Sequence, residues 1–259
     1  MKKMIWGEDP DFSGPYDWFR NSLILQEIRK RRISGSVLDF GCGSGNLIIR
    51  LASSGFEGIG VDASALAVKY LSEKLKAKGL TRKFKVMVGR EQMLFRKGME
   101  KQFDLVVCGE TLEHLKDDWR AIQGFHQVLK KRGICVVTAP AHPRYWDQSE
   151  EYAGHYRRYE ERDLRALFER NGFVVETIFC WGFPVSLVWH RIVLLPLFTK
   201  KAEEGKIYSH SGTFFAELLS LQWLKRVFSY PFWIDQCFNW TRLGGGLLLV
   251  ARKNHSASA

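Results

Sequence analysis

The chain has 259 residues, 46% of them hydrophobic and 14% aromatic, which is enough to bury a full core as one domain with an elaboration. Its five cysteines include no Cys-x-x-Cys pair, which argues against a disulfide framework and against a zinc site. A net charge of +11 attracts nucleic acid, anionic lipid headgroups or phosphorylated substrates. The first fourteen residues lack the apolar core of a signal peptide, so we expect a cytoplasmic protein.

The N-terminal part predicts a helix that leads directly into a strand. Residues 16–32 carry Phe19 and Leu23 on one face, and their basic end, RKRR, suits the negative end of a helix dipole. An apolar run then starts at Val37. We therefore expect residues 1–34 to form an N-terminal cap ahead of the first strand.

The stretch from Val37 to Asp62, VLDFGCGSGNLIIRLASSGFEGIGVD, predicts a β-α-β unit with a ligand at its carboxyl edge. Glycines at positions 41, 43 and 45 follow Asp39, and glycine lets a chain turn sharply and bring its backbone against a bound molecule. Asp62, at the expected end of the second strand, is placed to accept both hydroxyl hydrogens of a ribose. These features together predict a nucleoside ligand.

Helical and strand-like segments alternate after Asp62. Expected helices cover residues 63–78, 118–129 and 161–171, and expected strands cover residues 84–88, 103–108, 133–138 and 173–179. The strand FDLVVC at 103–108 is a continuous apolar run of the kind that a parallel sheet buries on both faces. The alternation predicts an α/β fold with a doubly wound parallel sheet, whose cofactor-binding core is residues 35–180.

The C-terminal part departs from this pattern. Residues 181–242 are rich in Trp, Phe and Leu, and GLLLVAR at 246–252 predicts a last strand within residues 243–253. The most apolar part, residues 185–198, contains His190, Arg191 and Pro196 and is shorter than the roughly 20 residues of a spanning helix. We expect a single domain, 1–259, with a helical aromatic insertion before its last strand and no transmembrane segment.

The glycine loop does not fit a dinucleotide. Asn46 stands where G-x-G-x-x-G requires glycine, the third glycine comes one residue early, and Asp39 disfavours a pyrophosphate. An acid suits an ammonium group, and S-adenosylmethionine carries an α-amino group, a sulfonium and a ribose but no phosphate. LDFGCGSG followed by GVDAS closely resembles the first two motifs of class I S-adenosylmethionine-dependent methyltransferases.

Four further segments extend this resemblance over roughly residues 16–180. They are WFR at 18–20, FDLVVCGETLEHLKDD at 103–118, TAPAHPRYW at 138–146 and GHYRRYEERDLRALFERNGF at 154–173. They are similar to the ubiquinone-type (type 11 and type 12) bacterial branch, whose members act on small molecules, lipids and glycan intermediates. The resemblance implies a Rossmann-like seven-stranded sheet whose last strand is antiparallel beside the sixth.

The resemblance also implies roles for the cofactor site. Asp39 and the loop backbone would hold the methionine end, Asp62 the ribose, Ala63 the adenine face, and Cys108 would lie beside the methyl group. Arg90 replaces an acid that many relatives use for the adenine amino group, so Glu91 would supply its backbone N–H or its carboxylate. The expected cofactor-binding set is Arg20, Asp39, Gly41, Cys42, Gly43, Gly45, Asp62, Ala63, Glu91 and Cys108.

Methyl transfer needs a nucleophile in line and, where the nucleophile is protonated, a base. Histidine titrates near neutrality, and His114, His142 and His155 lie near predicted strand ends on the cofactor side. We expect His155 to be the catalytic residue, because its loop lies over the expected substrate mouth. The competing interpretation is that His155 only hydrogen-bonds its loop to the domain.

The sequence also offers an alternative metal site. Glu110, Glu113 and His114 form E-x-x-E-H, and two carboxylates with an imidazole suit a divalent cation. Such a motif more often closes a strand-to-helix turn beside the cofactor, so we expect no metal.

The insertion mixes aromatic and basic side chains. They are Trp181, Phe183, Trp189, Trp223, Phe228, Tyr230, Phe232, Trp233 and Trp240, with Arg191, Lys200, Lys201, Lys206, Lys225 and Arg226. This mixture suits a membrane interface or a lid over a lipid-linked substrate, so we expect peripheral contact with an anionic inner membrane face. The alternative is that these aromatics fill a small core of the insertion itself.

The predicted function is O-methylation of a small-molecule, lipid or glycan-linked acceptor. Methylation of RNA or protein is one alternative, and a cofactor-binding protein without transfer activity is another. We expect no specific nucleic-acid partner, because no RNA-binding module is recognisable and the fourth strand ends in CGET rather than in an Asn/Asp-Pro-Pro-aromatic motif.

Overall fold

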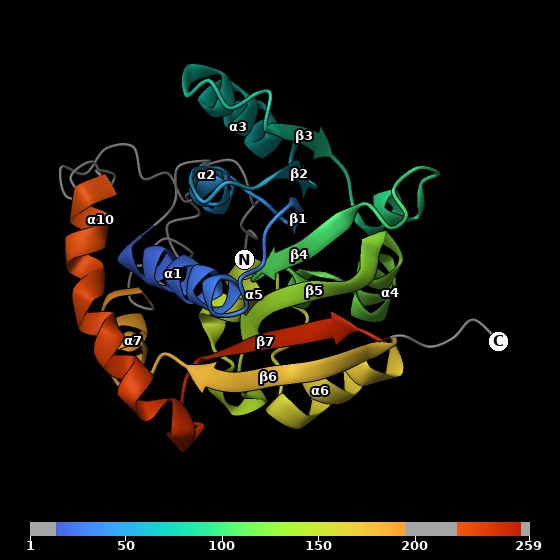
Figure 1. Cartoon of the computed structure of the whole chain (residues 1–259). Coiled ribbons are helices and arrows are strands. Elements are labelled where there is room, and N and C mark those ends of the chain that lie inside the picture. The colour runs from blue at the N-terminus through green and yellow to red at the C-terminus, as the bar shows by residue number, and fades with distance from the viewer. Residues whose placement is uncertain (1–13, 195–221, 255–259) are drawn as a thin grey trace.

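The computed structural model describes residues 14–194 and 222–254, which fold around one seven-stranded sheet with the order β3-β2-β1-β4-β5-β7-β6 (Figure 1). The strands are β1 Ser36–Phe40, β2 Glu57–Asp62, β3 Phe84–Val88, β4 Phe103–Gly109, β5 Leu129–Pro140, β6 Phe173–Trp181 and β7 Gly246–Lys253. β7 lies between β5 and β6 and is antiparallel to both, and the other pairs are parallel. The predicted Rossmann-like sheet with an antiparallel last strand is confirmed.

Helices cover both faces of the sheet. They are α1 Pro15–Lys30, α2 Asn46–Ser53, α3 Ala65–Ala77, α4 Asp118–Val128, α5 Gln148–Ala153, α6 Glu161–Arg170, α7 Val185–Trp189 and α10 Gln222–Ser229. Short 3-10 segments are η1 Glu91–Phe95, η2 Leu112–His114, η3 Pro143–Tyr145 and η5 Tyr230–Thr241, and η4 His190–Leu194 is a π-helical turn. α1, α2 and α3 pack on one face of the sheet, and α4 and α6 pack on the other.

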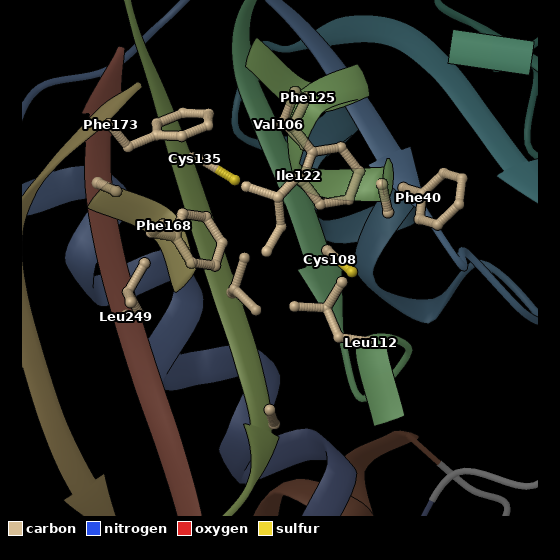
Figure 2. Close-up of a cluster of buried hydrophobic side chains, with 14 of the residues drawn as sticks. Phe40, Val106, Cys108, Leu112, Ile122, Phe125, Cys135, Phe168, Phe173 and Leu249 are labelled. Atoms are coloured by element: carbon tan, nitrogen blue, oxygen red, sulfur yellow. The ribbon is translucent and has the colours of Figure 1, made fainter. Parts of the chain in front are cut away.

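Strand alternation explains how one chain fills two cores. In β1, Val37 points toward α1 and α2, while Leu38 and Phe40 point toward α4 and α6. Figure 2 shows the second core, in which Phe125 packs edge-on against Phe40 with ring centroids 5.3 Å apart. Because central strands are buried on both faces, their sequences read as continuous apolar runs. Packing on both faces of the sheet thereby holds the carboxyl end of β1, from which the glycine loop leaves.

Two strand boundaries differ from the prediction. β5 begins at Leu129 rather than at residue 133, because Leu129 pairs with Phe103 of β4, and residues 130–133 form an irregularity before pairing resumes at Ile134. β6 continues to Trp181, because Cys180 and Trp181 pair with β7. The sequence KKRG at 130–133 favours a turn, and the strand nevertheless pairs with β4 on both sides of it.

Trp181 belongs to the core and does not open the insertion. Its side chain is buried, and its ring centroid lies 5.1 Å from that of Tyr16 and 6.0 Å from that of Phe19. A Cβ atom at Gly246 would approach the Trp181 ring to 2.5 Å, so only glycine leaves room for it there. The insertion therefore starts after Trp181, one residue later than the sequence predicts.

The described part of the insertion has both a buried and an exposed side. Phe232 is buried against Phe19 and Trp189, whose ring centroids lie 5.9 and 5.8 Å away. In contrast, Trp240 is 80% exposed and Ile192 is 69% exposed. Lys200, Lys201 and Lys206 of the predicted lid lie outside the described residues. Among residues 14–194 and 222–254, none of the helices combines the length and apolar character needed to span a bilayer.

Candidate active site

A cavity of about 930 Å³ opens at the carboxyl ends of β1, β2 and β4. The glycine loop after β1 and the turn after β2 form one wall, and η2, α5 and the loop that follows α5 form the opposite wall. α1 and the first turns of the insertion close it through Tyr16, Arg20, Leu187 and His190. Parallel sheets of this topology bind ligands outside the carboxyl ends of their strands.

The loop that follows β1 is hydrogen-bonded to Asp62 at the end of β2. Gly43 has a φ of 49°, and a Cβ atom there would meet nothing within 4 Å, so the loop presents bare backbone to the cavity. The Gly43 N–H donates to Asp62 Oδ2 over 2.8 Å, and the Ser64 N–H donates to Asp62 Oδ1 over 2.8 Å. Each carboxylate oxygen has two acceptor sites, so Asp62 keeps capacity for two further donors.

Asp39 is an unpaired acid at the floor of the cavity. Its side chain is 2% exposed, and its Oδ2 has no hydrogen-bond partner among the described residues. Burial and the neighbouring Asp62 raise the pKa of Asp39 to about 7, against the opposing effect of Arg20. A cationic ligand group beside Asp39 would remove this cost.

Arg20 faces the same cavity from α1. It pairs with Asp17 over 3.1 Å, and its buried Nε has no partner among the described residues. Burial lowers the pKa of Arg20, but Asp17 and Glu110 more than offset this and raise it, so the guanidinium stays charged. A carboxylate ligand would find a free donor here.

The opposite wall carries buried acids and two histidines. Glu113 is fully buried, and neither of its carboxylate oxygens has a hydrogen-bond partner in the described part of the chain. Its Oε1 lies 4.0 Å from His155 Nε2. Burial and neighbouring Glu110 raise the pKa of Glu113 well above its usual value, which favours a neutral carboxyl group. His114 packs edge-on against His155 with ring centroids 4.5 Å apart. Burial and His155 lower the pKa of His114 to about 3, so this ring is neutral.

A buried carboxylate, that of Glu150, contacts the imidazole ring of His155. Its Nδ1 contacts Glu150 Oε2, and the other oxygen of Glu150 accepts a hydrogen bond from Arg158. Glu150 lies on α5, and Arg158 lies just before Tyr159, which forms an isolated bridge with Ala141 at the end of β5. Glu150 was not predicted as a site residue, because a carboxylate five residues before a histidine is a weak signal unless the short helix between them is known. The side chain of Arg158 is only 7% exposed, although arginine is usually found at the surface.

The structure brings most of the predicted site residues to one cavity, and separates three from it. The lining includes Arg20, Asp39, Gly41, Cys42, Gly43, Asp62, Ala63 and His155. Cys108 is fully buried in the core toward α4, and Gly109 and Glu110 line the cavity instead. Gly89 and Arg90 line it in place of Glu91, whose backbone starts η1. Gly45 caps α2 from beneath the loop, where a Cβ atom would meet Leu71.

His142 has a structural role that separates it from the other two candidate bases. It is buried away from the cavity, with Nδ1 3.0 Å from Glu160 and Nε2 2.8 Å from the carbonyl oxygen of Arg242. It thereby ties the end of η5 to the core.

The geometry of the alternative metal site differs from the predicted set. Ligand atoms of Glu113, His114 and His155 lie within 4.8 Å of one another. Glu110 is not in this group, although it lines the same cavity. The two carboxylates and the imidazole of the E-x-x-E-H motif therefore do not form one cluster, because His155 takes the place of Glu110.

Comparison with known proteins identifies the family. A family described as methyltransferase domain matches residues 16–178, which is more than half of the chain. The chain belongs to the class I S-adenosylmethionine-dependent methyltransferases. The predicted family and cofactor are confirmed.

Individual relatives of this methyltransferase are distant. It is 33% identical over 130 residues to the protein named "Putative methyltransferase YqeM" of Bacillus subtilis (strain 168), covering 47% of each chain. It is 28% identical over 144 residues to the ubiquinone biosynthesis O-methyltransferase of Histophilus somni (strain 2336), covering 52% of this chain and 57% of that protein. The chain thus spans about half the length of these relatives.

Among solved structures, phosphoethanolamine N-methyltransferase 2 of Haemonchus contortus, in complex with S-adenosyl-L-methionine, shares the fold with a TM-score of 0.63 at 17% identity. The alignment covers 96% of this chain and 56% of that one.

The residues of the cavity fit this cofactor. The unpaired oxygen of buried Asp39 suits the α-amino group, and the free Nε of Arg20 suits the carboxylate. The open backbone at Gly43 leaves room for close approach, and Asp62 retains acceptor capacity for the ribose. Both charged ends of the methionine moiety would therefore meet a complementary group.

Proposed function

We propose that this chain transfers a methyl group from S-adenosylmethionine to a hydroxyl oxygen of a small-molecule or lipid-linked acceptor. The observation that carries the proposal is the shared cavity, because the glycine loop and Asp62 form one wall and His155 lies on the other. The cofactor supplies an electrophilic methyl group on its sulfonium. The protein has to hold the acceptor oxygen near that group and to take up its proton.

His155 is the base in this proposal. Its Nδ1 is engaged by Glu150, which leaves Nε2 on the side of Glu113 and the cavity. His114 is less suited to this task, because the lowered pKa of its ring makes it a poor proton acceptor at neutral pH. A neutral Glu113 carboxyl group is able to donate a hydrogen bond to the acceptor oxygen and so to orient it.

Acceptor selection is proposed to lie with the insertion. Ser186, Leu187, His190 and Arg191 line the cavity from α7 and η4, and exposed aromatic residues follow on η5. A lipid-linked acceptor could lie with its apolar part along this side while its hydroxyl group enters the cavity. Peripheral contact with an anionic membrane belongs to the same proposal, because Arg226 and Arg242 are exposed beside these aromatics.

The test is transfer of a labelled methyl group from S-adenosylmethionine into cell extract. Products are separated into lipid, small-molecule, RNA and protein fractions, and the stability of the label to base distinguishes esters from ethers. Label in the lipid or small-molecule fraction supports the proposal. Label confined to RNA or protein favours those acceptors, and no label in any fraction, despite cofactor binding, favours a binding protein without transfer activity.

A further inference from the structure

The support behind His155 is a hydrogen-bonded chain of two buried charged side chains. Glu150 is 3% exposed, and its two oxygens contact different partners, His155 Nδ1 and Arg158 Nη1. A buried ion pair costs desolvation, and removing one partner leaves an uncompensated charge. Both charges are nevertheless kept within the wall of the reaction cavity.

Arg158 anchors this chain to the sheet. Its Nε donates to the carbonyl oxygen of Ala141 over 2.7 Å, and its Nη2 donates to that of Gly245 over 2.8 Å. The Ala141 N–H also donates to Gly245 O over 2.8 Å, so both carbonyls belong to the joined ends of β5 and β7. The guanidinium therefore holds the Glu150 carboxylate at a position set by rigid strands.

The loop does not need the Glu150 side chain for its closure. The His155 N–H already donates to the Glu150 carbonyl oxygen over 3.0 Å, and the Gly154 N–H donates to Glu151 O over 3.1 Å. Gly154 ends α5 in the left-handed conformation. Since these backbone bonds close the turn, the side-chain contact to His155 serves another purpose.

That purpose follows from the chemistry of the contact. An ionised carboxylate only accepts hydrogen bonds, so Nδ1 of His155 must carry the hydrogen. In the neutral ring the lone pair then lies on Nε2, the nitrogen on the cavity side, 4.0 Å from Glu113. The carboxylate also faces any positive charge that the ring acquires.

We propose that Glu150 is a positioning residue for methyl transfer, which fixes the tautomer and orientation of His155 and is itself held by Arg158. The inference rests on the proposed function. In the step it supports, the acceptor O–H proton moves to Nε2 while the oxygen lone pair forms the new C–O bond. The electron pair of the S–C bond goes to sulfur, and the imidazolium charge faces Glu150.

The direct test is the ring tautomer of His155. Protein labelled with 15N-histidine is observed by two-bond 1H–15N NMR at pH 8, where free histidine is neutral, and His155 is assigned by its loss in His155→Gln. The native protein is expected to show Nδ1–H. In Glu150→Gln, Arg158 is expected to donate to the amide oxygen, which leaves the amide NH2 group facing Nδ1 of His155. Nδ1 must then accept a hydrogen bond, so the ring is expected to switch to the Nε2–H tautomer. An unchanged tautomer in this variant overturns the proposal.

Activity supplies the second readout. Single-turnover methyl transfer into the acceptor fraction found above is expected to fall about a hundredfold in Glu150→Gln, while calorimetric affinity for S-adenosylmethionine stays within about twofold. The matched control is Arg157→Met, which removes the neighbouring ion pair with Asp118 but touches neither Glu150 nor His155, and it should change neither readout.

Two further outcomes separate the possible failures. If His155→Gln is inactive and Glu150→Gln is fully active, His155 remains the base and the role of Glu150 is wrong. If His155→Gln is fully active while the tautomer switches as expected, the contact is real and the proposed base is wrong. Should Glu150→Gln fail to fold, the double variant Glu150→Met/Arg158→Met removes both charges at similar volume, and retention of a pure Nδ1–H tautomer there also overturns the proposal.

Discussion

Asp39→Asn should make the cofactor-free protein more stable at neutral pH and, at the same time, a poorer binder. The pKa of Asp39 is raised from 3.8 to about 7 in the folded protein, first by burial and then by Asp62. The folded state therefore binds more protons than the unfolded state between these values, and the stability that this group contributes at low pH is lost as pH rises toward 7. Asparagine is neutral throughout and escapes this loss.

The structure sets the size of the effect. A rise in pKa from 3.8 to about 7 corresponds to at most about 4 kcal/mol, at about 1.4 kcal/mol for each pH unit. The difference in unfolding free energy between Asp39→Asn and the native protein should be near zero at pH 4 and approach that value above pH 7. Urea unfolding at pH 4, 5, 6, 7 and 8 measures it.

The control is an acid whose pKa moves the other way. Burial raises the pKa of Asp104, but hydrogen bonds from Lys130 and Ser36 outweigh this and lower it. Asp104→Asn should therefore destabilise the protein above pH 4. If both variants show the same pH dependence, or if Asp39→Asn gains nothing above pH 7, the raised pKa of Asp39 is wrong. The same Asp39 variant should bind S-adenosylmethionine at least about tenfold more weakly, because it loses a charge-assisted hydrogen bond to the ammonium group.

Asp62→Ala should weaken S-adenosylmethionine at least about tenfold, since each lost charge-assisted bond is worth roughly 1.5–3 kcal/mol, and unchanged calorimetric binding would remove Asp62 from the ribose site. His155→Ala should lower turnover about a hundredfold with little change in cofactor affinity, and full activity would leave it a loop-holding residue. Anionic vesicles should sediment the native protein at low salt and release it at high salt, with Trp240→Ser/Ile234→Ser sedimenting less. A protein that ignores such vesicles at low salt contradicts the membrane proposal.

The sequence predicted the sheet better than the walls of its cavity. β1 and β2 followed from apolar runs that end in Asp39 and Asp62, because a parallel sheet imposes that pattern on every strand it buries. The residue that reaches a cavity from the end of a strand depends on one-residue register, which the pattern does not carry. The family resemblance implied that Cys108 lies beside the cofactor, whereas the next residue of β4, Gly109, lines the cavity.

Contacts that depend on a short, irregular segment could not be predicted from the sequence. The contact between Glu150, His155 and Arg158 needs a six-residue helix, α5, that has no amphipathic repeat long enough to detect. The insertion was predicted from composition, which distinguishes neither the buried Phe232 from the exposed Trp240 nor the side of the molecule each one occupies.

The pairing of Trp181 with Gly246 has a consequence for how such proteins diversify. Since the insertion leaves from one strand and returns on its neighbour, its two ends are one strand spacing apart whatever its length. The entropy of closing a longer or shorter segment between fixed ends changes slowly with length, so the sheet tolerates exchange of everything between these two residues. Tyr16 and Phe19 limit this freedom, because their rings pack against Phe232. If the insertion selects the acceptor as proposed, a graft that transfers acceptor preference to another methyltransferase would have to carry α1 together with the insertion.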